Sequence, residues 1–214
     1  MVAVTKSAEV LRVLERYLVE VVERYELCPW ARTSREHGEL AVGILWGTPS
    51  LEAWVAEAER LLAVPAVCVA MVIAPELAIS REAFGAVRDR VAARIPLAGV
   101  AEFHPTASLD LATPARLVPF LRRSPDPLLQ LVPLALIDAA REAARAGAPA
   151  AGLAQQATML GGHAAAPRTG LAERIAAANH ATVAEAHAAI TRVLDAIAAD
   201  RSAAYARAGI TSFR

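Results

Sequence analysis

Lysine is nearly absent from this chain of 214 residues: Lys6 is the only one, and every other basic residue is arginine. The 22 basic residues balance 22 acidic residues, so the formal net charge is +0. A chain without excess positive charge lacks the electrostatic signature of proteins that bind polyanions. We therefore expect no nucleic-acid partner.

The sequence also lacks an apolar run long enough for a membrane span. The longest run, Leu61–Pro75, is interrupted by Pro65 and falls short of the ~20 residues that cross a bilayer. The first residues lack the basic stretch and apolar core of a signal peptide. Two cysteines, Cys28 and Cys68, are too few for a disulfide scaffold. These features predict a soluble cytoplasmic protein that does not bind a membrane.

Motifs for known cofactors are missing as well. The sequence has no zinc-ligand spacing, phosphate-binding glycine loop, dinucleotide fingerprint or nucleophile elbow. We predict no cofactor and no metal site. The dipeptide Cys28-Pro29 does occur in proteins whose cysteine thiolate ligates haem iron, which keeps a haem or metal-binding protein as a third hypothesis.

Apolar residues make up 56% of the chain and recur with helical and strand periods in alternation. The predicted helices are Ser7–Glu26, Leu51–Leu62, Arg81–Ile95, Thr113–Leu121, Leu134–Ala146 and a long one from Leu171 to about Ala208. The predicted strands are Leu40–Trp46, Ala66–Ala74, Ala98–His104 and Leu128–Val132, and Arg32–Gly38 is predicted to be a polar loop. This order predicts an α/β fold with a four-stranded sheet packed with helices.

Composition divides the chain into three parts. Residues 1–146 form the predicted α/β body, and residues 147–170, rich in Ala, Gly and Pro, form a connection or lid. Residues 171–214 carry the long C-terminal helix, whose apolar stripe predicts docking on the body or on a second copy of the chain. A homodimer is therefore one possible assembly.

The stretch Val100–Pro105 has the pattern of a strand that carries ionisable residues to its end. Glu102 and His104 are two residues apart and project from one side, whereas Phe103 projects from the other. His104 is a candidate general acid/base or metal ligand, with Glu102 or a backbone carbonyl setting its tautomer. The alternative is a histidine with only local hydrogen bonds.

Two adjacent arginines, Arg122 and Arg123, precede a loop stiffened by prolines. Guanidinium groups in such a place can hold a carboxylate or phosphate. We assign anion binding or an internal ion pair to Arg123 and solvation to Arg122, and Ser124 either donates to the same anion or caps the turn. The loop meets His104 only if the fourth strand is antiparallel; in an all-parallel sheet it lies at the opposite edge.

Three segments taken in order are similar to the uncharacterised bacterial domain-of-unknown-function family fourteen-fifteen. They are Leu27-Cys28-Pro29-Trp30-Ala31, Phe103-His104-Pro105 and Arg123-Ser124-Pro125-Asp126-Pro127. The family pattern has Phe at the position of Trp30, Tyr at Asp126 and His at Gln130, and its Arg-Glu pair beyond that His is absent here. The family has no assigned activity.

What the resemblance implies is one shared site for Cys28, His104, Arg123 and Ser124, and hence a mixed sheet. Cys28 as a nucleophile needs a lowered pKa, which His104 or the arginines could supply and which a helix C-terminus opposes. The alternative is a small buried side chain. Asn179 falls on the apolar stripe of the last helix, so it needs a hydrogen-bond partner there, on the body or on a ligand.

These residues support two hypotheses of different kinds. The first is a small-molecule enzyme with His104 and Glu102 in acid/base roles, Cys28 as nucleophile or support, and an anionic substrate bound by Arg122, Arg123, Ser124 and Asn179. It predicts that His104, Arg123 and Cys28 converge on one pocket. The second is a non-catalytic ligand-binding or dimeric interaction module, which predicts that these residues are buried in mutual hydrogen bonds.

Overall fold

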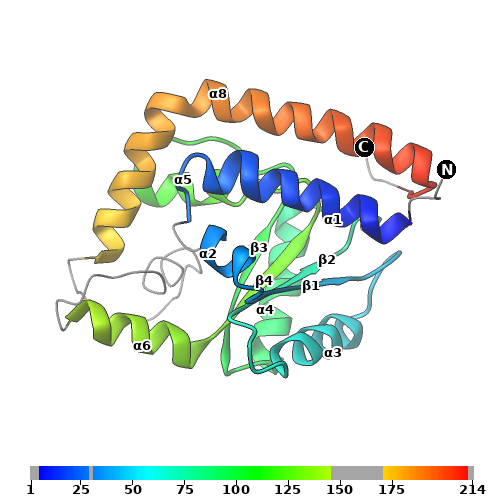
Figure 1. Ribbon diagram of the computed structural model, residues 1–214, viewed down its shortest axis with the longest axis horizontal. Helices are drawn as coiled ribbons and strands as arrows, with labels where there is room; N and C mark the ends of the chain where they lie inside the picture. Colours follow the sequence, from blue (N-terminus) through cyan, green and yellow to red (C-terminus); the bar gives the residue numbers. More distant parts are fainter. Residues whose placement is uncertain (1–4, 29–30, 146–170, 212–214) are drawn as a thin grey trace.

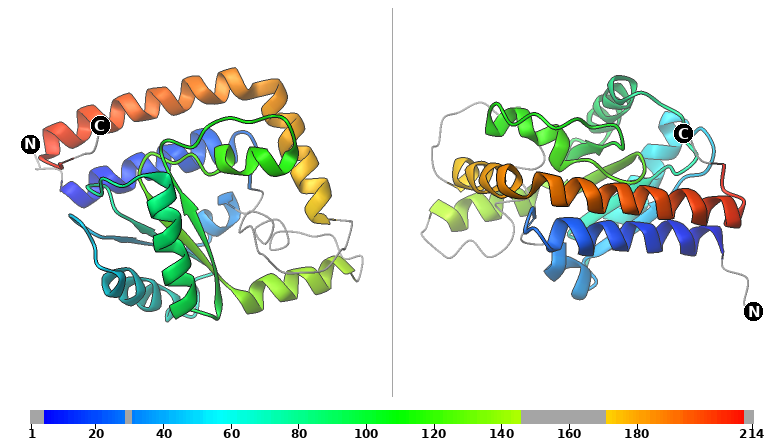
Figure 2. Two further views of the ribbon diagram at one scale, coloured as in Figure 1. Left: turned by 180° about the vertical axis from the view of Figure 1, so that it is seen from behind. Right: turned by 90° about the horizontal axis from the view of Figure 1, so that it is seen from above.

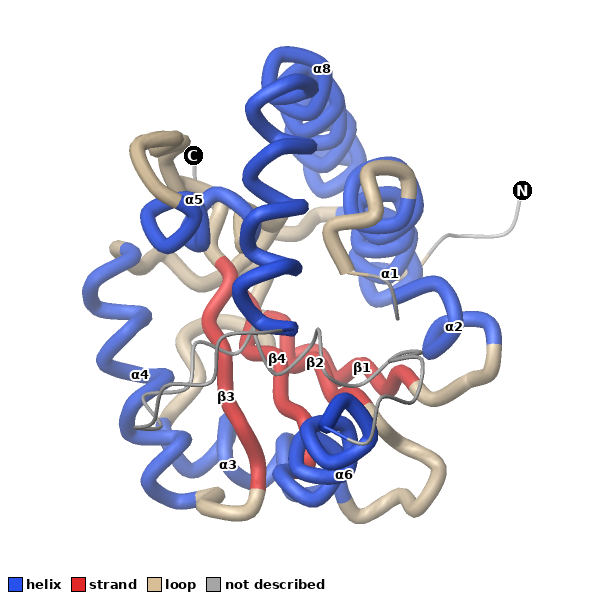
Figure 3. The backbone as a smooth tube through the Cα atoms, turned by 90° about the vertical axis from the view of Figure 1, so that its left-hand side faces the viewer, coloured by secondary structure: helices blue, strands red, loops and turns tan. Residues whose placement is uncertain are grey.

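The computed structural model describes residues 5–28, 31–145 and 171–211. Its sheet has four strands in the order β1-β2-β4-β3: β1 (Leu40–Ile44), β2 (Val69–Ile73), β3 (Ala98–Phe103) and β4 (Leu128–Pro133). β1 and β2 are parallel, whereas β4 is antiparallel to both β2 and β3 (Figure 3). The predicted α/β fold with a mixed sheet is confirmed, and the fourth strand is the antiparallel one.

Helices cover both faces of the sheet (Figure 1). One face carries α3 (Leu51–Leu62) and α4 (Arg81–Arg94). The other carries α1 (Lys6–Tyr17), its continuation η1 (Leu18–Glu23), α5 (Pro114–Leu121) and the long α8 (Leu171–Ala208). Two further helices in the described part of the chain are α2 (Ala31–Glu36) and α6 (Leu134–Arg145). α8 and α1 run side by side (Figure 2), and α8 lies on the side of α1 away from the sheet (Figure 1).

Four helices begin directly after a Ser or Thr that caps their N-terminus. The side-chain oxygens of Thr5, Ser50, Ser80 and Thr113 each accept a hydrogen bond of 3.2 Å from the backbone N–H three residues later. β2 is buried along its whole length, with neighbours on both edges, because α1 covers one of its faces and α3 the other.

The first helix differs from its prediction near its end. The pattern predicts a regular helix over Ser7–Glu26, but η1 is a π-helical turn in which hydrogen bonds span five residues: Arg24 N–H to Val19 O at 3.2 Å and Leu27 N–H to Val22 O at 2.9 Å. The buried apolar residues continue along one side of the helix from α1 through η1, so apolar periodicity alone does not reveal the widened turn. Such turns occur frequently at functional sites.

The polar loop predicted for Arg32–Gly38 is wrong, since α2 occupies most of it. Glu23 is buried beneath this helix, and the Arg35 guanidinium donates to both of its carboxylate oxygens at 2.7 and 3.0 Å. The bidentate pair fastens α2 to η1. The polar composition of the segment therefore reflects a buried ion pair rather than an irregular loop.

The C-terminal helix docks on the body through α1. Arg12 and Arg16 of α1 each donate to Asp200 of α8 at 2.7 Å, and the apolar side of α8, including Val183 and Ile190, joins the core cluster of α1. The predicted connection or lid at 147–170, and residues 29–30, lie outside the described residues.

Candidate functional site

One edge of the sheet brings the end of β3 and the loop 122–127 together. β1, β2 and β3 end at this edge, and β4 begins there because it runs the opposite way. The backbone N–H of His104 donates to Arg122 O at 3.0 Å, and that of Ala74 donates to Pro127 O at 3.0 Å. The loop 122–127 therefore meets the end of β3, as the antiparallel alternative predicts.

His104 is buried, and both of its ring nitrogens are engaged. Nε2 lies 3.1 Å from Ile79 O and Nδ1 lies 2.9 Å from the Thr106 hydroxyl. A carbonyl oxygen only accepts, so Nε2 carries the proton and Nδ1 accepts from Thr106, whose backbone N–H is also 3.3 Å away. The ring of Phe84 lies 6.0 Å from the imidazole, between centroids.

Burial lowers the pKa of His104 below its ordinary value, and the charge of Arg81 adds to the shift, while the Ile79 carbonyl and Glu82 oppose it. The imidazole is therefore neutral at pH 7. It holds the loops after β2 and β3 together in the free protein, and an acid/base role would require that Nδ1 leave Thr106.

This environment makes the stability of the protein depend on His104 in the acidic range. The folded-state pKa lies below the unfolded one, so the stabilisation is present above the unfolded pKa and decreases as the pH falls through it. We expect the midpoint of urea unfolding to fall between pH 7 and pH 5 more steeply in the native chain than in His104→Gln, whose amide can still donate to Ile79. Equal slopes would contradict a neutral, buried imidazole.

Glu102 lies on the same side of β3 as His104, but it does not orient the imidazole. Its Oε2 is 3.3 Å from Nε of Arg88 and 3.8 Å from a terminal nitrogen of Arg122. The tautomer of His104 is fixed by Ile79 instead. The carboxylate serves as a counter-charge to two arginines.

The solvation expected for Arg122 is wrong, whereas Arg123 forms an internal ion pair, one of its two expected roles. Arg122, predicted to be solvated, is only 9% exposed, and burial lowers its pKa while Glu102 opposes that shift. Arg123 has a side chain 28% exposed and pairs with Asp195 of α8 at 3.3 Å. Arg122 ends helix α5 and is the one of the two turned toward Glu102.

Arg122, Glu102, His104 and Arg81 line one small pocket of about 40 Å³, whose other walls are Ala107, Val118 and Pro119. His104 and Arg81 also line a wider, open depression of about 580 Å³ at the start of α4. Its remaining walls are Ala78, Ile79, Ser80, Glu82, Thr106 and Ser108. The two hollows therefore share a wall made of one imidazole and one guanidinium.

Ser124 caps the turn, because its hydroxyl donates to Asp126 O at 2.6 Å. Asp126 itself is buried, accepts from Arg201 Nε at 2.7 Å and from the Tyr205 hydroxyl at 2.7 Å, and so ties this loop to α8. Arg201 also donates to Pro75 O at 3.1 Å. Sequence reasoning missed this network, and the only signal for it was a carboxylate between two prolines.

Cys28 does not join His104. It packs with Phe103 in the core cluster under α1, whereas the imidazole contacts Phe84 in the cluster under α4. The alternation of Phe103 and His104 along the strand separates the two across the sheet. The three-residue convergence that the enzyme hypothesis predicts is therefore not what the structure shows.

Asn179 is buried, and its side-chain nitrogen donates to Leu27 O at 3.3 Å. It links α8 to the segment that follows η1. The sequence left two partners open for Asn179, the body or a ligand, and the contact is with the backbone of the body. Asn179 does not belong to the loop 122–127.

The described ranges contain no group of three or more His, Cys, Asp or Glu side chains placed to share a metal ion. Within the same residues, no helix combines the length and apolar character needed to cross a membrane. Comparison of the chain with protein-family models, curated proteins and solved structures finds no match, so the family resemblance stays a prediction.

Proposed function

We propose that the protein binds a small anionic molecule, carrying a carboxylate or a phosphate, in the depression at the end of β3. The observation that carries the proposal is the placement of Arg81 and Arg122 on the walls of adjoining hollows that share His104. Guanidinium groups bind such anions by paired, charge-assisted hydrogen bonds.

The charges around the hollows support an anionic ligand. Glu102 is the carboxylate of the inner pocket, and it is shared between Arg88 and Arg122. Arg81 opens α4, a helix of 14 residues whose N-terminal end adds a partial positive charge. Glu82 is exposed at the rim of the depression. An anion entering the open depression would thus meet Arg81 first, and Arg122 lies beyond it on the wall of the inner pocket.

The test compares two arginines of one helix by titration calorimetry with inorganic phosphate and with succinate. Arg81→Met is expected to weaken binding by about 10- to 100-fold, the effect of losing a charge-assisted hydrogen bond. Arg90→Met, on an exposed position of α4, is the matched control and should bind like the native chain. Absence of native binding at millimolar anion, or equal affinities of the two variants, would overturn the proposal.

A second candidate function is acid–base catalysis on the bound anion, favoured by the place of His104 on the wall shared by both hollows. A substrate hydroxyl that replaces Thr106 at Nδ1 would find a neutral imidazole able to accept its proton. In a screen of hydroxylated carboxylates and phosphate esters, turnover should vanish in His104→Gln while anion binding persists. Turnover that survives this change would exclude His104 as the base.

A further inference from the structure

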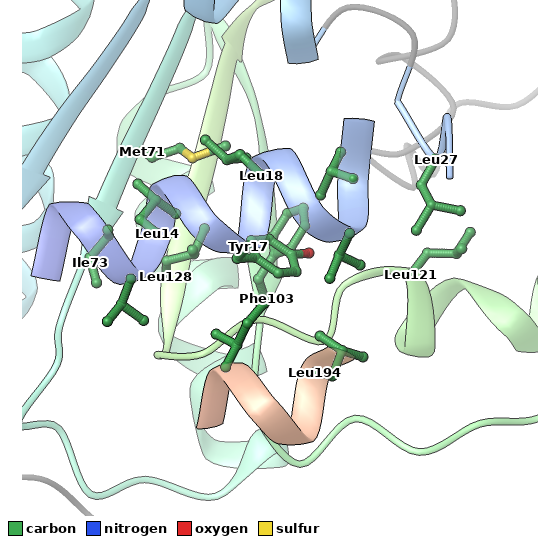
Figure 4. Packing of buried hydrophobic residues seen from close by; sticks show 14 of the residues in the cluster. Leu14, Tyr17, Leu18, Leu27, Met71, Ile73, Phe103, Leu121, Leu128 and Leu194 are labelled. Carbon is green, nitrogen blue, oxygen red and sulfur yellow. The ribbon is translucent and has the colours of Figure 1, made fainter. Parts of the chain in front are cut away.

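The long helix α8 packs near the edge of the sheet where the two hollows lie. Leu194 of α8, Phe103 at the end of β3 and Leu128 at the start of β4 belong to one core cluster (Figure 4). The described residues that line the two hollows come from other elements. α8 can therefore act on the site only through the loops that form it.

One side chain of this helix, that of Arg201, bridges two of these loops. Its Nε donates to Asp126 Oδ1 at 2.7 Å, in the loop 122–127, and a terminal nitrogen donates to Pro75 O at 3.1 Å, in the loop 74–80 after β2. Arg201 is 8% exposed and Asp126 is 4% exposed. Charge-assisted hydrogen bonds are strong, and burial protects these from screening by salt. The guanidinium group therefore fixes the position of one loop relative to the other.

Both loops also hold His104 and carry the arginines of the site. The loop 74–80 includes Ile79, whose carbonyl accepts the His104 Nε2–H at 3.1 Å, and it leads directly into Arg81. The loop 122–127 begins with Arg122, whose carbonyl accepts the backbone N–H of His104 at 3.0 Å. A shift of one loop against the other would change the separation of the two guanidinium groups and disturb the bond that holds the imidazole.

We propose that Arg201 is a positioning residue of the anion site, holding the loops 74–80 and 122–127 at the spacing at which Arg81 and Arg122 serve the same ligand. The inference rests on the proposed function and adds regulation to it. Binding and positioning are linked equilibria, so an anion that contacts both loops favours the bridged position of Arg201, and the bridge raises the affinity for the anion by the same factor. α8 is thereby a regulatory element outside the site.

Exchange of the His104 Nε2 proton with water tests the positioning without any ligand. Arg201→Lys keeps a charge opposite Asp126 but loses the planar fork that also reaches Pro75 O. In proton NMR of the full chain, we expect this exchange to be at least about tenfold faster in Arg201→Lys, with a smaller increase for the amides of β2, which report global opening. The double change Asp126→Asn with Arg201→Met, which leaves no unpaired charge, should give the same result.

Asp200→Asn is the matched control. Asp200 is the neighbour of Arg201 on α8, but it pairs with Arg12 and Arg16 of α1, each at 2.7 Å, and leaves both loops untouched. Its Nε2 exchange, relative to the amides of β2, should equal that of the native chain. The inference fails if the control accelerates this exchange as much as Arg201→Lys does, or if neither Arg201 variant accelerates it beyond β2.

Titration calorimetry with inorganic phosphate separates the inference from the proposed function. Arg201→Lys should bind phosphate about 5- to 150-fold more weakly than the native chain, the usual range of coupling between sites, and Asp200→Asn should bind like the native chain. A native chain that binds neither phosphate nor succinate would contradict the proposed function, whereas faster Nε2 exchange in Arg201→Lys would still support positioning of the loops. Unchanged phosphate affinity in a variant with faster exchange would overturn the regulation.

Discussion

Replacing Arg201 by methionine is expected to lower the free energy of unfolding by about 3–5 kcal/mol, the cost of removing one partner of a buried ion pair. The substitution leaves the Asp126 carboxylate enclosed with the Tyr205 hydroxyl as its remaining side-chain donor. It also removes the hydrogen bond to Pro75 O, which joins α8 to the loop after β2. Urea unfolding at pH 7 measures the effect.

Arg207→Met is the matched control, since Arg207 is exposed on the same helix. It should change the free energy of unfolding by less than ~0.5 kcal/mol. The double change Asp126→Asn with Arg201→Met should recover part of the loss, because it removes the uncompensated buried charge. A loss below ~1 kcal/mol in Arg201→Met would contradict the burial of the pair.

Phe84→Ala is expected to cost about 3–5 kcal/mol, the range measured when large aromatic side chains are removed from cores. Phe84 is fully buried and lies between Trp54, at 5.7 Å, and the His104 ring, at 6.0 Å, as centroid distances. The change should also raise the pKa of His104 toward its ordinary value, because water gains access to the imidazole.

Proton NMR titration of His104 measures the second effect separately from stability. Phe84→Leu keeps most of the volume and should leave the pKa of His104 close to that of the native chain. A pKa that stays equally low in Phe84→Ala would show that the Ile79 and Thr106 loops, rather than the aromatic ring, exclude water from the imidazole.

Local chemistry made much of the fold predictable. Ser50, Ser80 and Thr113 mark helix starts by their own hydrogen bonds, and the apolar run at β2 identifies a buried strand without any knowledge of its neighbours. The orientation of β4 depends instead on pairing with strands far along the chain. Only the family resemblance favoured the correct alternative.

The candidate site was harder to predict for the same reason. Which of Arg122 and Arg123 turns inward depends on how the loop approaches β3, and Asp126 finds Arg201 75 residues later. Cys28 and His104 illustrate the reverse case. Strand alternation already placed Phe103 and His104 on opposite faces of the sheet. The sequence does not say which of these faces lies beneath the first helix, and so it does not say which of them Cys28 approaches.

The position of β4 also sets the order in which the sheet can be completed during synthesis. β3 pairs only with β4 among the strands described, so a nascent chain that ends before Leu128 carries β3 with no neighbour at either edge. β1 and β2 can already pair at that stage, since both precede it. The sheet can therefore be completed only when β4 has been synthesised. The Asp126 carboxylate, in the loop before β4, can pair with its cation only after Arg201 has been synthesised.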